Sequence, residues 1–180
     1  MSIYLRELIH EDIKIINVWR NDKTLVDQLG SIFRYINIET DERWFEQYMN
    51  NRTSQIRCAI IEGENEKIIG VIYLLNIDYI NRCGEFNIFI GDVNQQGTGY
   101  GFCATIQMLE HAFFNLNLNR VYLTVLEENI RAINTYVKCG FTEEGTIRQC
   151  LYKNGNYKNM KLMSILKEEF VNLYQNIINI

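Results

Sequence analysis

The sequence feature that most constrains the fold is a hydrophobic segment followed closely by three glycines. Residues 87–90 read Asn-Ile-Phe-Ile, which favours a β-strand, and residues 96–101 read Gln-Gly-Thr-Gly-Tyr-Gly. A helical pattern then runs to residue 114. Glycines let a main chain approach an anion closely, and the N–H groups at a helix N-terminus favour negative charge. The segment therefore predicts a strand, a turn that can hold a pyrophosphate, and a helix.

Other interpretations of this turn compete with an anion site. Glycines between a strand and a helix can serve chain geometry alone. A Walker A phosphate loop is excluded because its Gly-Lys-Ser/Thr ending is missing. Gly99-x-Gly101-x-x-Ala104 fits the spacing of a Rossmann dinucleotide fingerprint. However, the acidic residue expected about 20 residues later is replaced by Asn119 and Arg120. The Rossmann interpretation is therefore weak.

Length and composition predict a single α/β domain over residues 1–180. The chain is 47% hydrophobic and contains no linker-like or repeated segment. A net charge of −4 with dispersed Lys and Arg argues against a nucleic-acid partner. The absence of a signal core and of an apolar run of ~18 residues predicts a cytoplasmic protein without a membrane partner. Five cysteines without C-x-x-C spacing, and two isolated histidines, predict no metal site.

The hydrophobic pattern places two strands around the helix that follows the glycines. Residues 85–90 and 121–126 favour strands, and residues 101–114 favour a helix between them. A strand, helix and strand in this order form a βαβ crossover, which makes the two strands parallel if they pair directly.

Capping and turn signals define further elements. Asn129 is a favourable N-cap for a helix over residues 130–139, and Gly140 fits its left-handed end. Asn154-Gly155 predicts a hairpin turn. The other expected elements are strands at residues 3–5, 57–61, 67–73, 145–152 and 157–166, and helices at residues 11–19, at 170–178, and from a cap at Thr40 through Trp44 and Tyr48.

Two motifs together resemble a known family. Gln96-x-x-Gly99-x-Gly101 is similar to the acetyl-coenzyme A motif of the GCN5-related N-acetyltransferases (GNAT). Asn129-x-Arg131-Ala132-x-x-x-Tyr136-x-x-x-Gly140-Phe141 is similar to the motif that follows it in their RimJ/RimL-like branch. The likeness extends to Trp19-Arg20-Asn21-Asp22 and to Tyr152-x-x-Gly155-x-Tyr157, so it covers most of the chain.

This resemblance implies a fold and an activity. The fold is α/β: a mixed, largely antiparallel sheet flanked by helices, with a central wedge between two parallel strands where acetyl-CoA inserts. The activity is transfer of acetyl from acetyl-CoA to a primary amine by direct attack in a ternary complex. A small-molecule amine, such as a polyamine or an amino sugar linked to a nucleotide, is the preferred acceptor. Alternatives are protein N-termini, or a non-catalytic acetyl-CoA sensor. A homodimer is a further expectation for this chain.

The resemblance also implies roles for individual residues. Tyr136 stands where the family keeps the acid that protonates the departing thiolate, since a phenol stays protonated at neutral pH. Glu85 is the first candidate for the base and Glu127 the second. Arg34 and Tyr35 lie in the region that closes over the acceptor. The expected acetyl-CoA contacts, including main-chain groups of the strand and an oxyanion-binding N–H near Phe89, are Ile88, Phe89, Ile90, Gln96, Gly97, Thr98, Gly99, Tyr100, Gly101, Asn129 and Arg131.

Overall fold

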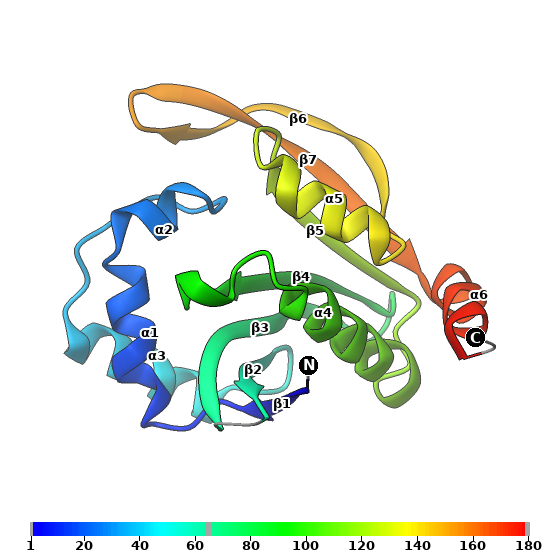
Figure 1. Cartoon of the computed structure of the whole chain (residues 1–180), viewed down its shortest axis with the longest axis horizontal. Coiled ribbons are helices and arrows are strands. Elements are labelled where there is room, and N and C mark those ends of the chain that lie inside the picture. The colour runs from blue at the N-terminus through cyan, green and yellow to red at the C-terminus, as the bar shows by residue number, and fades with distance from the viewer. Residues whose placement is uncertain (1, 64–65, 179–180) are drawn as a thin grey trace.

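The computed structural model describes residues 2–63 and 66–178, and its centre is one mixed β-sheet (Figure 1). Within these residues seven strands pair in the order β1-β2-β3-β4-β5-β7-β6. All neighbours are antiparallel except β4 and β5, which are parallel. The predicted fold class is confirmed. The strands are β1 (Ile3–Glu7), β2 (Ile56–Glu62), β3 (Lys67–Asp78), β4 (Cys83–Ile90), β5 (Arg120–Leu126), β6 (Thr142–Lys153) and β7 (Asn156–Leu166).

The parallel pair is short, and this shapes the molecule. β4 and β5 pair only where Cys83 to Glu85 lie opposite Arg120 to Tyr122. Beyond these positions β4 continues along β3, and β5 continues along β7, so the two strands separate. The predicted βαβ crossover is therefore present, and it opens into a wedge on the side where β4 ends.

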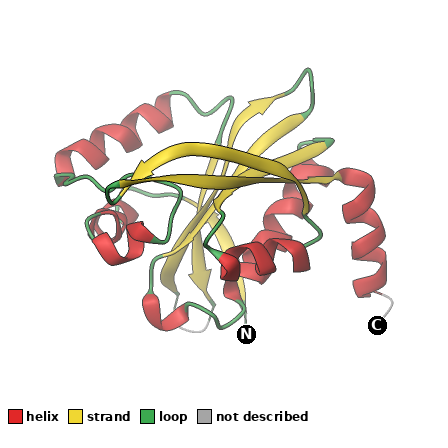
Figure 2. Ribbon diagram, turned by 90° about the horizontal axis from the view of Figure 1, so that it is seen from above, coloured by secondary structure: helices red, strands yellow, loops and turns green. Residues whose placement is uncertain are grey.

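Helices cover both faces of the sheet (Figure 2). On one face α1 and α3 enclose a core built around Ile13, Trp19 and Phe45. On the other face α4 and α6 enclose a larger core that includes Phe86 and Phe113. The helical segments are α1 (Asp12–Arg20), α2 (Lys23–Asp27), α3 (Ile38–Asn50), the 3₁₀ turn η1 (Val93–Gln95), α4 (Tyr100–Glu110), the π-helical turn η2 (His111–Asn115), α5 (Ile130–Lys138) and α6 (Lys167–Ile178).

Local signals explain most helix ends. Asn129 caps α5, as predicted, because its Oδ1 accepts the N–H of Ala132 at 3.1 Å. Gly140 follows α5 with φ 95°, the left-handed conformation expected there. The predicted cap at Thr40 was wrong: α3 begins earlier, because Oδ1 of Asn37 accepts the N–H of Thr40 at 3.1 Å.

The C-terminal hairpin follows its turn sequence. Asn154 and Gly155 have φ values of 50° and 82°, the left-handed pair that a two-residue hairpin turn requires. β6 and β7 therefore pair from Lys153 and Asn156 onward, and α6 follows them. In the described part of the chain, none of the helices combines the length and the apolar character needed to span a bilayer.

Candidate active site

A cavity of about 920 Å³ occupies the wedge between β4 and β5. Its walls come from β4, β5, the start of α4, one side of α5 and the residues at the ends of α1 and α2, and residues of β2, β3 and α3 line its far end. The volume lies near the upper end of the range typical of ligand sites, about 300–1,000 Å³. The splay of the parallel pair thus creates a long site rather than a packed core.

The edge of β4 presents main-chain groups to this cavity. Gly91 donates its N–H to the carbonyl of Ile69 on β3 at 2.9 Å. Hydrogen-bonded pairs alternate with non-bonded pairs along an antiparallel ladder, so Phe89, two residues before Gly91, uses its main-chain groups to bond Val71 on β3. The N–H and C=O groups of Ile88 and Ile90 then face the wedge. The predicted main-chain role of Phe89 does not fit this register, although its side chain lines the cavity.

The glycine-rich turn forms one end of the cavity. Gly97 and Gly99 have φ values of 79° and 99°, and a Cβ on either would meet nothing within 4 Å. Gly99 is the N-cap of α4 and supplies no side-chain cap. The first-turn N–H groups of α4 therefore remain available to an anion, and Gly101 also lines the cavity. This open main-chain cradle fits the pyrophosphate of acetyl-CoA.

Two residues of this turn that were predicted to contact acetyl-CoA use their side chains for hydrogen bonds within the protein. Thr98 donates its hydroxyl to the carbonyl of Gln95 at 2.7 Å. Tyr100 is buried and donates its hydroxyl to Glu62 at 3.0 Å. Neither residue lines the cavity, so only their main-chain groups can serve the anion.

Arg131 joins three parts of the cavity mouth. Its Nη2 donates to Oε1 of Gln96 at 3.0 Å and to Oε1 of Gln28 at 2.9 Å. Gln96 in turn donates its Nε2 to the carbonyl of Ile90 at 2.9 Å. Asn129 both caps α5 and donates to the carbonyl of Gln28 at 2.9 Å. The predicted contacts Gln96, Asn129 and Arg131 therefore lie together.

Tyr136 lines the same cavity from α5. Its ring is buried against Phe86 and Phe141, with centroid distances of 6.1 and 5.8 Å. Among the described residues no side chain or main chain bonds to its hydroxyl. Burial raises its pKa above the usual value near 10, so the phenol keeps its proton at neutral pH. The hydroxyl is therefore a proton donor without a structural partner.

The two candidate bases lie in different places. Glu85 lines the cavity, and its Oε2 accepts the amide of Asn76 at 2.8 Å. Glu127 lies outside that wall. It accepts from Asn159 at 2.8 Å and pairs with Lys161 at 3.2 Å, and both contacts lower its pKa. A carboxylate stabilised in its ionised form is a weaker base, so the geometry argues against Glu127.

The structure does not bring Arg34 and Tyr35 to the cavity wall. Tyr35 is 92% exposed and packs edge-on against Phe33 at 5.1 Å. The wall on this side is instead formed by residues 28–31, which follow α2 and are called the wall segment below. The hydrophobic pattern shows no clear periodicity in this region, because α2 is only five residues long.

The far end of the cavity contains two arginines that were not predicted as site residues, although Arg20 belongs to the Trp-Arg-Asn-Asp motif. Arg57 lies between the rings of Trp44 and Tyr73, 4.8 Å from each centroid, and burial lowers its pKa. Arg20 pairs with the buried carboxylate of Asp41. No local pattern marks Arg57, because its burial depends on helix α3 packing over the sheet.

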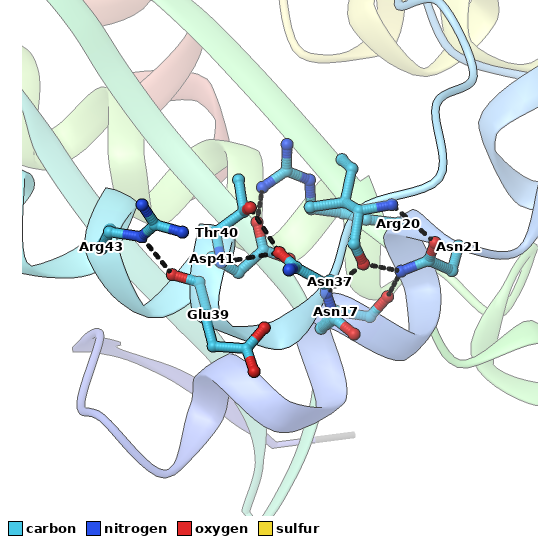
Figure 3. Close-up of polar contacts among 9 residues, drawn as sticks. Asn17, Arg20, Asn21, Asn37, Glu39, Thr40, Asp41 and Arg43 are labelled. Atoms are coloured by element: carbon cyan, nitrogen blue, oxygen red, sulfur yellow. Dashed lines mark hydrogen bonds and ion pairs between the residues drawn. The ribbon is translucent and has the colours of Figure 1, made fainter.

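Figure 3 shows what holds Arg20 in place. Asn17 donates to Asp41 at 2.7 Å, so the carboxylate bonds both side chains of α1. Asn21 accepts the N–H of Ile36 at 3.0 Å and donates to its carbonyl at 2.8 Å. Arg20 and Asn21 of the Trp-Arg-Asn-Asp motif thus tie the end of α1 to α3 and to Ile36 just before it.

Comparisons with known proteins agree with this architecture. A family model described as an acetyltransferase (GNAT) domain matches residues 2–142. A spermidine N(1)-acetyltransferase of Vibrio cholerae is 31% identical over 95% of this chain and 96% of that protein. A spermidine N(1)-acetyltransferase of Escherichia coli is 29% identical over 94% of this chain and 89% of that protein.

Solved structures show the same likeness. A crystal structure of spermidine N-acetyltransferase from Vibrio cholerae, in complex with CoA and spermine, has a TM-score of 0.88 at 28% identity. The match covers 94% of this chain and 98% of that one. The chain therefore belongs to the GNAT family and is an acetyl-CoA-dependent N-acetyltransferase.

Proposed function

We propose that this protein transfers acetyl from acetyl-CoA to a primary amine of a small molecule, and that polyamines are its acceptor class. The observation that carries the proposal is one continuous cavity that runs from the glycine-rich turn to Tyr136 and Glu85. The similar proteins from Vibrio cholerae and Escherichia coli are named as spermidine acetyltransferases, and they match nearly the whole chain.

The cofactor end of the cavity binds acetyl-CoA, which supplies an activated thioester. The free N–H groups at the start of α4 hold its pyrophosphate, and Arg131 adds a positive charge beside them. Main-chain groups of Ile88 and Ile90 bond to its extended arm. These contacts place the thioester near Tyr136, and positioning supplies much of the rate.

Two side chains move protons in this proposal. A primary amine is an ammonium ion at neutral pH and must lose a proton before it attacks. Glu85 accepts that proton, directly or through one water, because it is the carboxylate among the described lining residues. Tyr136 donates its proton to the departing thiolate of CoA. The attacking nitrogen releases its second proton to solvent as the carbon–sulfur bond breaks. The phenolate then regains a proton from solvent, and Glu85 releases the proton it accepted, which completes the cycle.

A panel of amines tests this function. The protein is mixed with acetyl-CoA and single acceptors, and the release of free thiol is followed. We expect turnover with spermidine and spermine, and none with quaternary amines of similar charge, which cannot be acetylated. Binding of acetyl-CoA without turnover on any amine would instead favour the sensor alternative.

The arginines at the far end of the cavity favour a second candidate, an amine that also carries an anionic group. Arg57 has no carboxylate partner among the described ion pairs, and it lies beside aromatic rings that could stack on a planar base. An amino sugar linked to a nucleotide has this chemistry. Arg57→Met should then raise KM for such acceptors but not for spermidine, whereas Arg34→Met, outside the cavity, should change neither.

Membership of the RimJ/RimL-like branch would favour protein N-termini as acceptors, and a peptide beginning with Ser or Ala in the same panel tests it. We further propose that residues 1–180 act as one cytoplasmic domain, which can form a homodimer. Sedimentation at several protein concentrations measures that state.

A further inference from the structure

Lys153 is a buried lysine that the proposed reaction does not use. It is the last residue of β6, and only 4% of its surface is exposed. Its Nζ donates to the carbonyls of Val26 at 2.6 Å, Leu29 at 2.6 Å and Ser31 at 2.9 Å. None of the described carboxylates forms an ion pair with it. All three N–H bonds of the ammonium are therefore used by main-chain carbonyls.

These carbonyls belong to the end of α2 and to the wall segment. A helix of five residues is too short to be stable alone, and the carbonyl of Val26 near its end has one main-chain partner, the N–H of Leu29 at 2.9 Å, just beyond the helix. A positive charge at a helix C-terminus satisfies such carbonyls and interacts favourably with the helix dipole. Lys153 thus stabilises the end of α2 from the neighbouring hairpin, whose turn lies beside α2 in Figure 1.

The wall segment is also held from the opposite side. Its first residue, Gln28, accepts from Asn129 through its carbonyl and from Arg131 through its side chain. The same guanidinium bonds to Gln96 next to the glycine-rich turn. The segment therefore connects the C-terminal hairpin to the cofactor end of the cavity, and Lys153 is the contact on the hairpin side.

We infer that Lys153 is a positioning residue for acetyl-CoA binding. By fixing the wall segment, it holds Gln28 where Arg131 needs an acceptor, and it keeps Arg131 beside the glycine-rich turn. This inference rests on the proposed use of that turn for acetyl-CoA. Tyr136 and Glu85 lie on α5 and β4 and have no contact with Lys153, so the chemical step should be less affected than binding.

The test is Lys153→Met, which keeps the length and apolar body of the side chain but removes its donors. We expect KM for acetyl-CoA to rise between about 10- and 100-fold, as for other small displacements of a binding group. We expect kcat at saturation to stay within about twofold. A wild-type KM in the folded variant, or a loss of kcat at unchanged KM, would overturn the inference.

A matched control lies at the same hairpin. Lys23 donates to the side chains of Asn154 at 3.0 Å and Asp27, but it bonds to no carbonyl of the wall segment. Lys23→Met removes one lysine and one link between α2 and the hairpin turn. KM for acetyl-CoA should stay at the wild-type value. An equal rise in KM would show that the hairpin contact in general matters, not the Lys153 ammonium.

A second variant covers the case in which Lys153→Met does not fold. Lys153→Arg keeps the charge and donors, but a planar guanidinium cannot direct one nitrogen at three carbonyls, so KM should rise less than in the Met variant. A wild-type KM in this variant, when the Met variant is unfolded, would count against the inference. Calorimetric titration with CoA gives the same comparison as a dissociation constant. This binding measurement tests the role of Lys153 even if no amine supports turnover. Absence of turnover would contradict the proposed function, not the role of Lys153.

Discussion

At the scale of single residues, the candidate chemistry depends on neighbours more than on residue type. Glu85 and Glu127 are both carboxylates near the parallel strands, yet one faces the cavity and the other pairs with Lys161. Tyr136 gains its raised pKa from burial, and its hydroxyl has no partner in the described structure. The sequence could propose these three residues from motif and position, but their surroundings come only from tertiary packing.

The first residue-scale prediction compares the two carboxylates. Glu85→Gln should lower kcat by about 100-fold or more, because a positioned base contributes this much to proton transfer. Glu127→Gln is the matched control, and it should leave kcat near the wild-type value because Glu127 lies outside the cavity. Steady-state thiol release measures both. Equal losses in the two variants would remove Glu85 from its proposed role.

The second residue-scale prediction concerns the protonation of Tyr136. Because burial raises its pKa, the phenol stays protonated as the pH rises, so its ionisation should not reduce kcat below pH ~10. Tyr136→Phe should lower kcat by about 100-fold or more at every pH in this range. A wild-type rate in this variant, or an alkaline limb near pH 8 that Tyr136→Phe abolishes, would contradict the acid assignment.

The raised pKa of Tyr136 also makes the stability of the protein depend on pH. Above pH ~10 an unfolded tyrosine loses its proton, whereas buried Tyr136 keeps it. The unfolded state then binds fewer protons than the folded state, so the free energy of unfolding should fall as the pH rises further. Urea titrations between pH 8 and 11 should show a smaller fall in Tyr136→Phe than in the wild type.

At the scale of elements, local rules worked where the signal is local. Asn129, Gly140 and the Asn154-Gly155 turn each occupy the predicted place, because caps and left-handed turns depend on a few adjacent residues. The βαβ crossover was likewise predictable from periodicity. α2 was not, since five residues carry too little pattern and its end is stabilised by Lys153, far away in the sequence. Long-range contacts of this kind are also the reason why Arg57 was not predicted as a site residue.

Gly91 gives a prediction about how α1 meets the end of β4. A Cβ at this position would lie 2.0 Å from Cδ2 of Trp19, whose ring is buried and packs edge-on against Phe89 at 6.0 Å. Gly91→Ala should therefore lower the free energy of unfolding by about 1–3 kcal/mol, the usual cost of overpacking. Denaturant titration measures this value.

Gly101→Ala is a suitable comparison for stability. Its Cβ would meet Ile90 Cγ1 at an ordinary 3.9 Å, inside helix α4. We expect no loss of stability, and a gain of about 0.5–1 kcal/mol from the better helix propensity of alanine. An unchanged free energy of unfolding in Gly91→Ala would mean that Trp19 can move aside without cost.

At the scale of the whole molecule, the separation of β4 from β5 lets one sheet both carry the core and hold a ligand. The cavity reaches both helical faces, so a ligand in the wedge contacts elements from either side. A saturating ligand should therefore stabilise the complete domain. At 100 times its dissociation constant it adds about 2.7 kcal/mol, which raises Tm by about 5–11 °C for a domain of this size.

Pantetheine provides the control for this prediction. It has the extended arm of CoA but no pyrophosphate, so it lacks the group assigned to the glycine-rich turn. At equal concentration CoA should raise Tm clearly more than pantetheine, and added salt should reduce the difference because it screens charge. Equal shifts for the two compounds would mean that the turn does not bind the pyrophosphate. Thermal unfolding followed by circular dichroism gives both values.

The contact between Lys153 and Val26 also orders events during synthesis. These residues are 127 positions apart, so the ribosome adds the lysine roughly 6–25 s after the valine, at about 5–20 residues per second. Until the hairpin leaves the exit tunnel, the end of α2 lacks its ammonium partner, and one side of the wedge is unsupported. A nascent chain stalled before residue 153 should therefore bind acetyl-CoA poorly, even though every glycine of the turn has already been translated.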